Sequence, residues 1–157
     1  MVLLVQGLLI GIGATVLLDL YNVALARFAG IPAPNWGMIG RWFWHLREGT
    51  VFHDSIAEAA PYDREVQLGW VMHYAVGAIY GLVLAVVMGA GWMAAPTVLP
   101  ALILGWLTVG FGWFLLQPGL GLGWAASRAE TPMKVRGLNL AAHTVFGVGL
   151  WLSALVV

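Results

Sequence analysis

A run of twenty residues without a charged side chain, from Leu68 to Val87, limits what this chain can fold into more than any other feature. A helix of that length crosses the hydrocarbon layer of a bilayer, which is about 30 Å thick. Gly69, His73, Gly77 and Gly81 follow one another at steps of four residues inside the run, so they lie on one side of the helix. The run therefore predicts a membrane-spanning helix with a groove of small residues and one imidazole in the groove.

The composition of the whole chain points to a lipid environment. Hydrophobic side chains make up 61% of the residues and charged ones 9%, and the mean hydropathy is +0.89, which leaves too little polar surface for a soluble globule. The formal net charge is zero, so we expect the lipid bilayer as a partner and no nucleic acid. The absence of cysteine excludes disulfides, thiolate catalysis and iron–sulfur clusters.

Four apolar segments predict an all-α polytopic membrane protein with four transmembrane helices. The predicted spans cover residues 2–26, 68–90, 96–116 and 138–157, within a single membrane domain of residues 1–157. Gln117 and Pro118 are expected to end the third helix, because proline cannot continue one. Thr131 and Pro132 are expected to cap and begin the lead-in to the fourth.

The basic residues all fall in the first and third connections between the predicted spans. They are Arg27, Arg41, Arg47, Arg64, Arg128, Lys134 and Arg136. Because basic residues gather on the cytoplasmic side of a membrane protein, both connections are predicted to be cytoplasmic and both termini to face outward, toward the periplasm in a bacterial cell.

The first connection, residues 27–67, is too long for a simple loop. Between Asn35 and Leu46 it reads NWGMIGRWFWHL, with apolar residues close to helical spacing, and this predicts an amphipathic helix in the headgroup region. Ser55 and Glu58 have the spacing of a capping box, which predicts the start of another short helix. The alternative is that the connection is an interfacial platform that only packs.

Polar residues inside the predicted spans are the best candidates for a site. Asp19, His73 and His143 lie about 7 to 12 Å inside the cytoplasmic boundary, judged from their distance to the ends of the spans. Small residues share their helix faces, so these groups are expected to meet each other instead of lipid. The candidate ligand pocket consists of Asp19, Asn22, Gln117 and Asn139.

Imidazole and carboxylate side chains on the same side also suggest a cofactor. The candidate metal ligands are His45, His53, Glu65, His73 and His143, which suit a divalent metal. His73 and His143 lie near the starts of two predicted helices that run in the same direction, so they could instead hold a haem iron from two sides. In the structural alternative, Asp19 pairs with a histidine or arginine to fix helix register, and hydroxyl or backbone groups satisfy each imidazole.

The glycine-rich stretch from Gly119 to Gly123 follows a helix and a proline, and it lacks the strand and the lysine of a phosphate-binding loop. We expect it to allow close backbone packing or a bend at the membrane surface. Ser127 and Arg128, just after it, are expected to contact lipid headgroups.

Several separated motifs resemble one family. The motifs are GIGATVLLD from Gly11, NWGMIGRW from Asn35, Phe52-His53 with Ser55-Ile56, LGWVMHYAVG from Leu68, QPGLGLGWAASR from Gln117 with Thr131-Pro132 after it, and AAHTVFGVGL from Ala141. Together they resemble a bacterial family of small polytopic membrane proteins described only as a domain of unknown function. The resemblance implies a bacterial inner-membrane location and four spans, and it implies no activity.

Three functions follow as hypotheses. The first is a membrane binding or transport protein, associating with further copies through its glycine-rich helix faces, with a polar pocket for a cation, proton or small ligand. The second is a membrane-embedded metal- or haem-dependent enzyme or redox subunit. The third is a structural accessory subunit. The outer halves of the spans contain almost no polar residue, which favours a site open to one side only.

Overall fold

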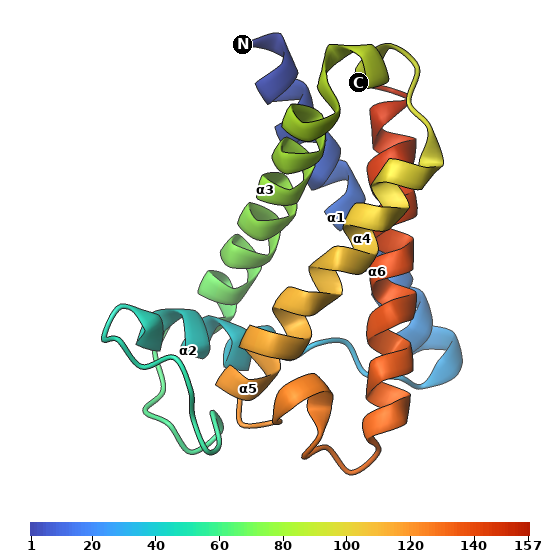
Figure 1. Ribbon diagram of the computed structural model, residues 1–157. Helices are drawn as coiled ribbons and strands as arrows, with labels where there is room; N and C mark the ends of the chain where they lie inside the picture. The colour runs from blue at the N-terminus through green and yellow to red at the C-terminus, as the bar shows by residue number, and fades with distance from the viewer. The chain divides into compact units, whose positions relative to one another are not determined.

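The computed structural model describes residues 1–157, and every regular element in it is helical (Figure 1). The elements are α1 (Val2–Ala29), α2 (Trp36–Leu46), α3 (Glu65–Ala94), α4 (Val98–Phe111), the π-helix η1 (Gly112–Leu116), α5 (Gln117–Gly119), the 3-10 helix η2 (Trp124–Ala126) and α6 (Pro132–Ala154). The all-α class predicted from the sequence is confirmed.

Three helical segments are long and apolar enough to cross a membrane: Val2–Ala29, Glu65–Ala94 and Val98–Gly119. They contain the first three predicted spans almost entirely. Helix α6 has 23 residues, but Asn139, His143 and Thr144 lower its hydropathy. The fourth span stays a prediction.

The chain forms two compact units. The first comprises Met1–Ala33, Tyr74–Thr108 and Leu140–Val157, and the second comprises Pro34–His73 and Val109–Asn139. Helices α3, α4 and α6 each contribute residues to both units. The single membrane domain expected from the sequence stays a prediction, and each unit is described by itself.

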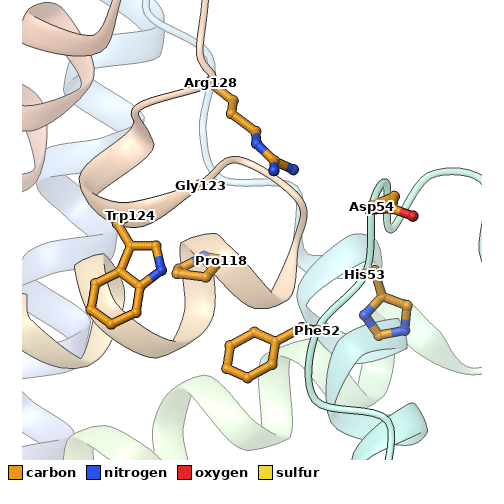
Figure 2. Close-up of a pocket in the computed structure, with 7 residues that line it drawn as sticks. All are labelled: Phe52, His53, Asp54, Pro118, Gly123, Trp124 and Arg128. Carbon is orange, nitrogen blue, oxygen red and sulfur yellow. The ribbon is translucent and has the colours of Figure 1, made fainter.

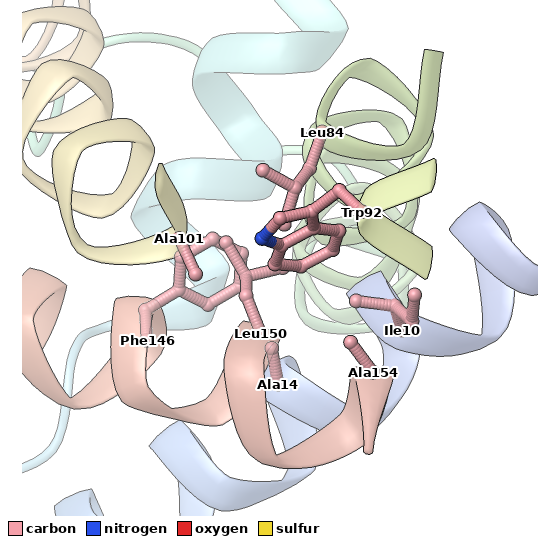
Figure 3. Packing of buried hydrophobic residues seen from close by; sticks show 8 residues of the cluster. All are labelled: Ile10, Ala14, Leu84, Trp92, Ala101, Phe146, Leu150 and Ala154. Atoms are coloured by element: carbon pink, nitrogen blue, oxygen red, sulfur yellow. The ribbon is translucent and has the colours of Figure 1, made fainter. Parts of the chain in front are cut away.

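A cluster of buried apolar side chains from α1, α3, α4 and α6 forms the core of the first unit (Figure 3). Its members are Ile10, Ala14, Leu84, Trp92, Ala101, Phe146, Leu150 and Ala154. The cluster combines large side chains with three alanines, and small residues beside large ones allow the helices to approach while the space between them is filled.

Helices α1 and α3 contact each other along their glycines. A methyl group on Gly7 would lie 2.9 Å from Cα of Leu82, and one on Gly11 would lie 2.7 Å from Cα of Ala78. Both distances are too short for a carbon contact, so only glycine permits this spacing of the helices. The predicted groove of small residues on α3 is thus confirmed at Gly77 and Gly81, and α1 fills it.

The same device joins α4 to α6, where a methyl group on Gly105 would lie 2.9 Å from Cα of Gly147. These glycine faces are therefore occupied within the chain. The predicted homo-oligomer stays a prediction, and it would need other surfaces.

Both termini and the connection between α3 and α4 lie at one end of the first unit (Figure 1). The side-chain amide of Gln6 donates to the carbonyl oxygen of Val157 at 3.2 Å. The regular part of α3 ends at Gly89, which has φ 69° and ψ −179°, a conformation that favours glycine.

In the second unit, α2 forms where the amphipathic pattern predicts it. The Asn35 side chain caps α2 by accepting a hydrogen bond from the backbone N–H of Met38 at 3.1 Å.

Two predictions about this unit are wrong. No helix begins at Ser55: residues 55–59 form turns, because Arg41 binds carbonyl groups that a helix would need for its own hydrogen bonds. The third helix does not end at Gln117, since helical backbone continues through η1 to Gly119. The wide turn of η1 spaces the backbone ahead of Pro118, whose ring would crowd the carbonyl four residues earlier in a regular helix.

Candidate functional site

An ion pair between Arg41 of α2 and Glu65 at the start of α3 organises the second unit. Nε of Arg41 donates to Oε2 of Glu65 at 2.8 Å, and Nη2 donates to Oε1 at 3.0 Å, which is the strong two-pronged geometry. The two side chains are only 13% and 21% exposed. The hydrogen bond to the carboxylate raises the pKa of Arg41 above its ordinary value, so this side chain is permanently charged.

The irregular segment between α2 and α3 has a few backbone hydrogen bonds within its turns, and side chains of α2 supply further bonds to its carbonyl groups. Nη1 of Arg41 donates to the carbonyl oxygens of Ile56, Ala57 and Ala59, each at 3.1 Å. Nε1 of Trp42, which is 1% exposed, donates to the carbonyl oxygen of Val51 at 2.8 Å. Backbone acceptors in a segment without secondary structure need such partners.

Two of the predicted metal ligands, His45 and His53, contact each other in this unit. Nδ1 of His45 lies 3.0 Å from Nε2 of His53. The outer nitrogens face backbone oxygens: Nε2 of His45 lies 2.9 Å from the carbonyl of Ala60, and Nδ1 of His53 lies 2.9 Å from the carbonyl of Gly119. The two rings therefore link α2, the irregular segment and α5 in one chain of hydrogen bonds.

A pocket of about 300 Å³ opens beside His53 (Figure 2). Its lining residues are Phe52, His53, Asp54, Pro118, Gly123, Trp124 and Arg128, and we call it the Arg128 pocket. Figure 2 shows Arg128 and Trp124 on one side, with Phe52, His53 and Asp54 on the other. Phe52 and Trp124 are 60% and 64% exposed as whole residues.

The loop that carries Arg128 has a fixed and unusual backbone. Gly121 and Gly123 have φ values of 89° and 72°, and Ala125 and Ala126 also have positive φ values, of 47° and 55°. Left-handed conformations are costly for alanine and persist only where the surroundings enforce them. Nε of Arg136 supplies one such contact by donating to the carbonyl oxygen of Ala125 at 2.8 Å.

Charges in the Arg128 pocket are open to a ligand. The Arg128 guanidinium and the Asp54 carboxylate are exposed, and neither makes a side-chain hydrogen bond or ion pair within the chain. The expectation that the glycine-rich stretch allows close packing is met at Gly121, where a methyl group would lie 2.8 Å from the carbonyl carbon of Asp54.

Among the predicted pocket residues, Gln117 and Asn139 contact each other. Oδ1 of Asn139 accepts from Nε1 of Trp113 at 3.1 Å and from Nε2 of Gln117 at 2.7 Å. Because an indole N–H can only donate, the orientations of both amides follow. Oε1 of Gln117 is then a buried acceptor with no hydrogen-bond partner, which is uncommon in a folded protein.

Asp19 and Asn22, the other predicted pocket residues, lie half-buried on α1 in the first unit. Oδ2 of Asp19 accepts a hydrogen bond from the hydroxyl of Tyr74 at 2.8 Å. Tyr74 follows His73 in the sequence and was not singled out as a partner. The predicted meeting of Asp19 with both intramembrane imidazoles stays a prediction.

His143 is held by Thr108 and Gly105. The Thr108 hydroxyl donates to the carbonyl oxygen of Gly105 at 2.7 Å, so its oxygen is free to accept from Nδ1–H of His143 at 2.8 Å. His143 is therefore hydrogen-bonded by a hydroxyl group, as expected in the alternative in which the polar residues have only a structural role. His73 packs its ring against Trp36 with centroids 4.1 Å apart.

No group of three or more His, Cys, Asp or Glu side chains is arranged to hold a metal ion. Of the five candidate ligands, His45 and His53 are in direct contact, whereas Glu65 is bound to Arg41. The haem hypothesis for His73 and His143 stays a prediction.

Sequence reasoning did not propose Phe52, Asp54 or Trp124 as site residues, and it considered Arg128 only for membrane orientation and as a headgroup contact. The available signals were Asp54 two residues after Phe52, Arg128 four residues after Trp124, and the glycine-rich stretch just before Trp124.

Comparison with known proteins yields one match. The model of a family described as "Protein of unknown function (DUF2938)" matches residues 8–157. No curated protein and no solved structure matches the chain.

Proposed function

Since the chain belongs to the DUF2938 family of unknown function, we propose a function from its own site: it is a multi-pass membrane protein that binds a small anionic ligand in the Arg128 pocket. The observation that carries the proposal is an unpartnered guanidinium beside a pocket of about 300 Å³ with two exposed aromatic rings.

We propose that α6 crosses the membrane as a fourth span, in addition to the three apolar segments. Helix α6 packs against α4 through the close approach of Gly105 and Gly147, and such contacts are typical of helices within a bilayer. With α6 as the fourth span, the positive-inside tendency places both basic connections in the cytoplasm. We propose the bacterial inner membrane as the location, with the Arg128 pocket on its cytoplasmic side.

The ligand class follows from the chemistry of the lining. A guanidinium presents several donors in a plane and binds the oxygens of a phosphate or carboxylate group with two parallel hydrogen bonds. Phe52 and Trp124 add apolar surface of the kind found where a membrane meets water. Among these anions, the proposed ligand is a phosphate ester, either a lipid headgroup or a soluble metabolite.

The proposal is tested with the full-length protein in lipid nanodiscs without anionic lipid. A soluble phosphate monoester is titrated by calorimetry, and vesicles of phosphatidate and of phosphatidylcholine are compared in a second assay. Arg128→Gln should weaken binding by about 2 kcal/mol, the contribution of a charge-assisted hydrogen bond. Binding of the soluble ester alone identifies a metabolite, and binding of phosphatidate alone identifies a headgroup.

Arg64→Gln is the matched control, because Arg64 is an exposed arginine of the same unit outside the pocket lining. It changes the net charge by the same amount. Equal losses in the two variants would mean that only the general basic charge matters, and the pocket proposal would then be wrong.

A further inference from the structure

Two neutral imidazoles have too few N–H groups for the chain of hydrogen bonds through His45 and His53. This chain contains three contacts of 2.9 to 3.0 Å, and its two ends are backbone carbonyl oxygens. A carbonyl oxygen can only accept. His45 must therefore carry a proton on Nε2, and His53 must carry one on Nδ1.

Each neutral imidazole has a single N–H, so these two protons are all that a neutral pair holds. Nδ1 of His45 and Nε2 of His53 would then face each other 3.0 Å apart with a lone pair on each side. Two lone pairs at that distance repel. A third proton between the two nitrogens turns this contact into a charge-assisted hydrogen bond, the stronger kind.

We propose that His45 and His53 share one additional proton and that this proton sets the net charge of the Arg128 pocket, so that anion binding is coupled to proton uptake. The coupling rests on the proposed function of the pocket. The only other charged residues in the lining are Arg128 and Asp54, which cancel. With the shared proton the pocket is cationic, and without it the pocket is neutral.

The charged groups around the pair leave its proton under the control of pH and ligand. Arg47 and Glu48, which follow His45, are paired with each other at 3.1 Å. Arg41 is paired with Glu65, and its guanidinium also holds the carbonyl of Ala59, next to the Ala60 carbonyl that faces His45. On the side of His53, the charged groups are Asp54 and Arg128. Neither ring is hydrogen-bonded to a carboxylate.

A metal ion in place of the proton fits the pair less well. Zinc bound by two imidazoles at about 2.0 to 2.1 Å, with tetrahedral geometry, separates the nitrogens by about 3.4 Å. The observed separation is 3.0 Å, and no third ligand of the usual types is grouped with the pair. The distance is that of a hydrogen bond between nitrogens.

The loss of the shared proton also has a structural consequence. A neutral pair can keep only two of the three hydrogen bonds, so one contact must open. The Ala60 end is exposed, where water replaces a lost bond at little cost, whereas the Gly119 end is partly buried. Deprotonation thus releases His45 from Ala60, while His53, which lines the pocket, keeps its contacts with His45 and Gly119.

The shared proton can be detected without any ligand. Full-length protein in nanodiscs, labelled with ¹⁵N-histidine, is studied by NMR at about pH 5.5, the lower end of the range in which imidazoles ordinarily change charge. We expect the ¹⁵N shifts to show Nε2 of His45 and Nδ1 of His53 protonated at the same time as a ¹⁵N–¹⁵N coupling appears across the contact between the two rings, and His45→Gln and His53→Gln should both remove this coupling. A coupling with only one of the two outer nitrogens protonated, or two neutral rings without a coupling, would overturn the shared proton.

The link to the anion is tested with sulfate, whose charge does not change over the range in which histidine titrates. Its affinity is measured by calorimetry at about pH 5.5 and about pH 8.5. We expect the affinity to fall about tenfold as the pH rises, because one positive charge leaves a site near the protein surface. His45→Gln should bind sulfate weakly and equally at both values, and His143→Gln should keep the parent's dependence on pH.

A second measurement covers the case in which the His45 variant does not fold. Calorimetry of the parent protein in buffers of different ionisation enthalpy counts the protons taken up with sulfate. At an intermediate pH we expect a fraction between zero and one, and no proton uptake would overturn the coupling. Sulfate binding that is independent of pH would leave the pocket standing and refute its regulation. No sulfate binding at either pH would refute both the anion pocket and its coupling to proton uptake. The ¹⁵N measurement would then show by itself whether His45 and His53 share a proton.

Discussion

Gly11→Ala should separate α1 from α3, and its cost can be worked out from the contact. The new methyl group would lie 2.7 Å from Cα of Ala78, and still closer to the carbonyl oxygen of Gly77. Ordinary contacts begin near 3.4 Å, so α1 has to move away by about 0.7 Å or more. Both neighbours are backbone atoms of a helix, which cannot turn aside as a side chain can.

The movement of α1 also affects the buried core, because Ile10 and Ala14 lie close to Gly11 on the same helix and are completely buried. Overpacking a well-filled core costs about 1 to 3 kcal/mol. We therefore expect Gly11→Ala to lower the free energy of unfolding by about 2 kcal/mol, measured by thermal or SDS-induced unfolding of the purified protein in detergent.

Gly91→Ala is the matched control. Gly91 lies in the helical end of α3 beyond the break at Gly89, and a methyl group there would meet no atom within 4 Å. In a helix, alanine is favoured over glycine by up to about 1 kcal/mol, so this variant should be as stable as the parent or more so. If Gly11→Ala and Gly91→Ala unfold alike, the glycine contact does not determine how α1 packs, and the reasoning fails.

Two further variants test the second unit. Asn139→Leu removes the acceptor for two partly buried donors and should cost about 1 to 3 kcal/mol in thermal unfolding. Gln117→Leu removes one donor together with an oxygen that has no partner, so it should cost less, and the reverse order would contradict the hydrogen-bond assignment. A lysine at position 41 cannot form the bonds to Glu65 and to three carbonyl groups at once. In Arg41→Lys, proteinase K should therefore cleave the chain within residues 47–64 about tenfold faster than in the parent. An unchanged cleavage rate would show that Arg41 does not hold that segment.

The helical layout was predictable because its signals are periodic. Uncharged runs define helices, and the four-residue spacing of Gly77 and Gly81 on α3 and of Gly7 and Gly11 on α1 identifies the faces that meet. The position of α2 was predictable for the same reason, with Asn35 as its cap. These features depend on residues that are near neighbours in the sequence.

The candidate site was not predictable in the same way. The bond from His53 to Gly119 joins residues 66 positions apart through segments that have no regular period. The positive φ values at Ala125 and Ala126 have no signature in a residue type that prefers helix. Sequence reasoning grouped five ligand-type residues because they are predicted to lie on the same side of the membrane. The side of the membrane alone does not determine which of these side chains touch.

The segment between α2 and α3 is attached to α2 by an arginine, a tryptophan and a histidine side chain. These three differ in whether their hydrogen-bond donors depend on pH. Arg41 keeps its charge at every physiological pH, and the indole of Trp42 does not titrate. The imidazole of His45 is the one attachment whose donors depend on a proton that pH or a ligand can remove. A segment held by Arg41 and Trp42 at Val51, Ile56, Ala57 and Ala59 stays folded while its contact at Ala60 opens. Proton loss from the imidazole pair would therefore change the charge of the Arg128 pocket and open one contact of the segment without unfolding the unit that carries both.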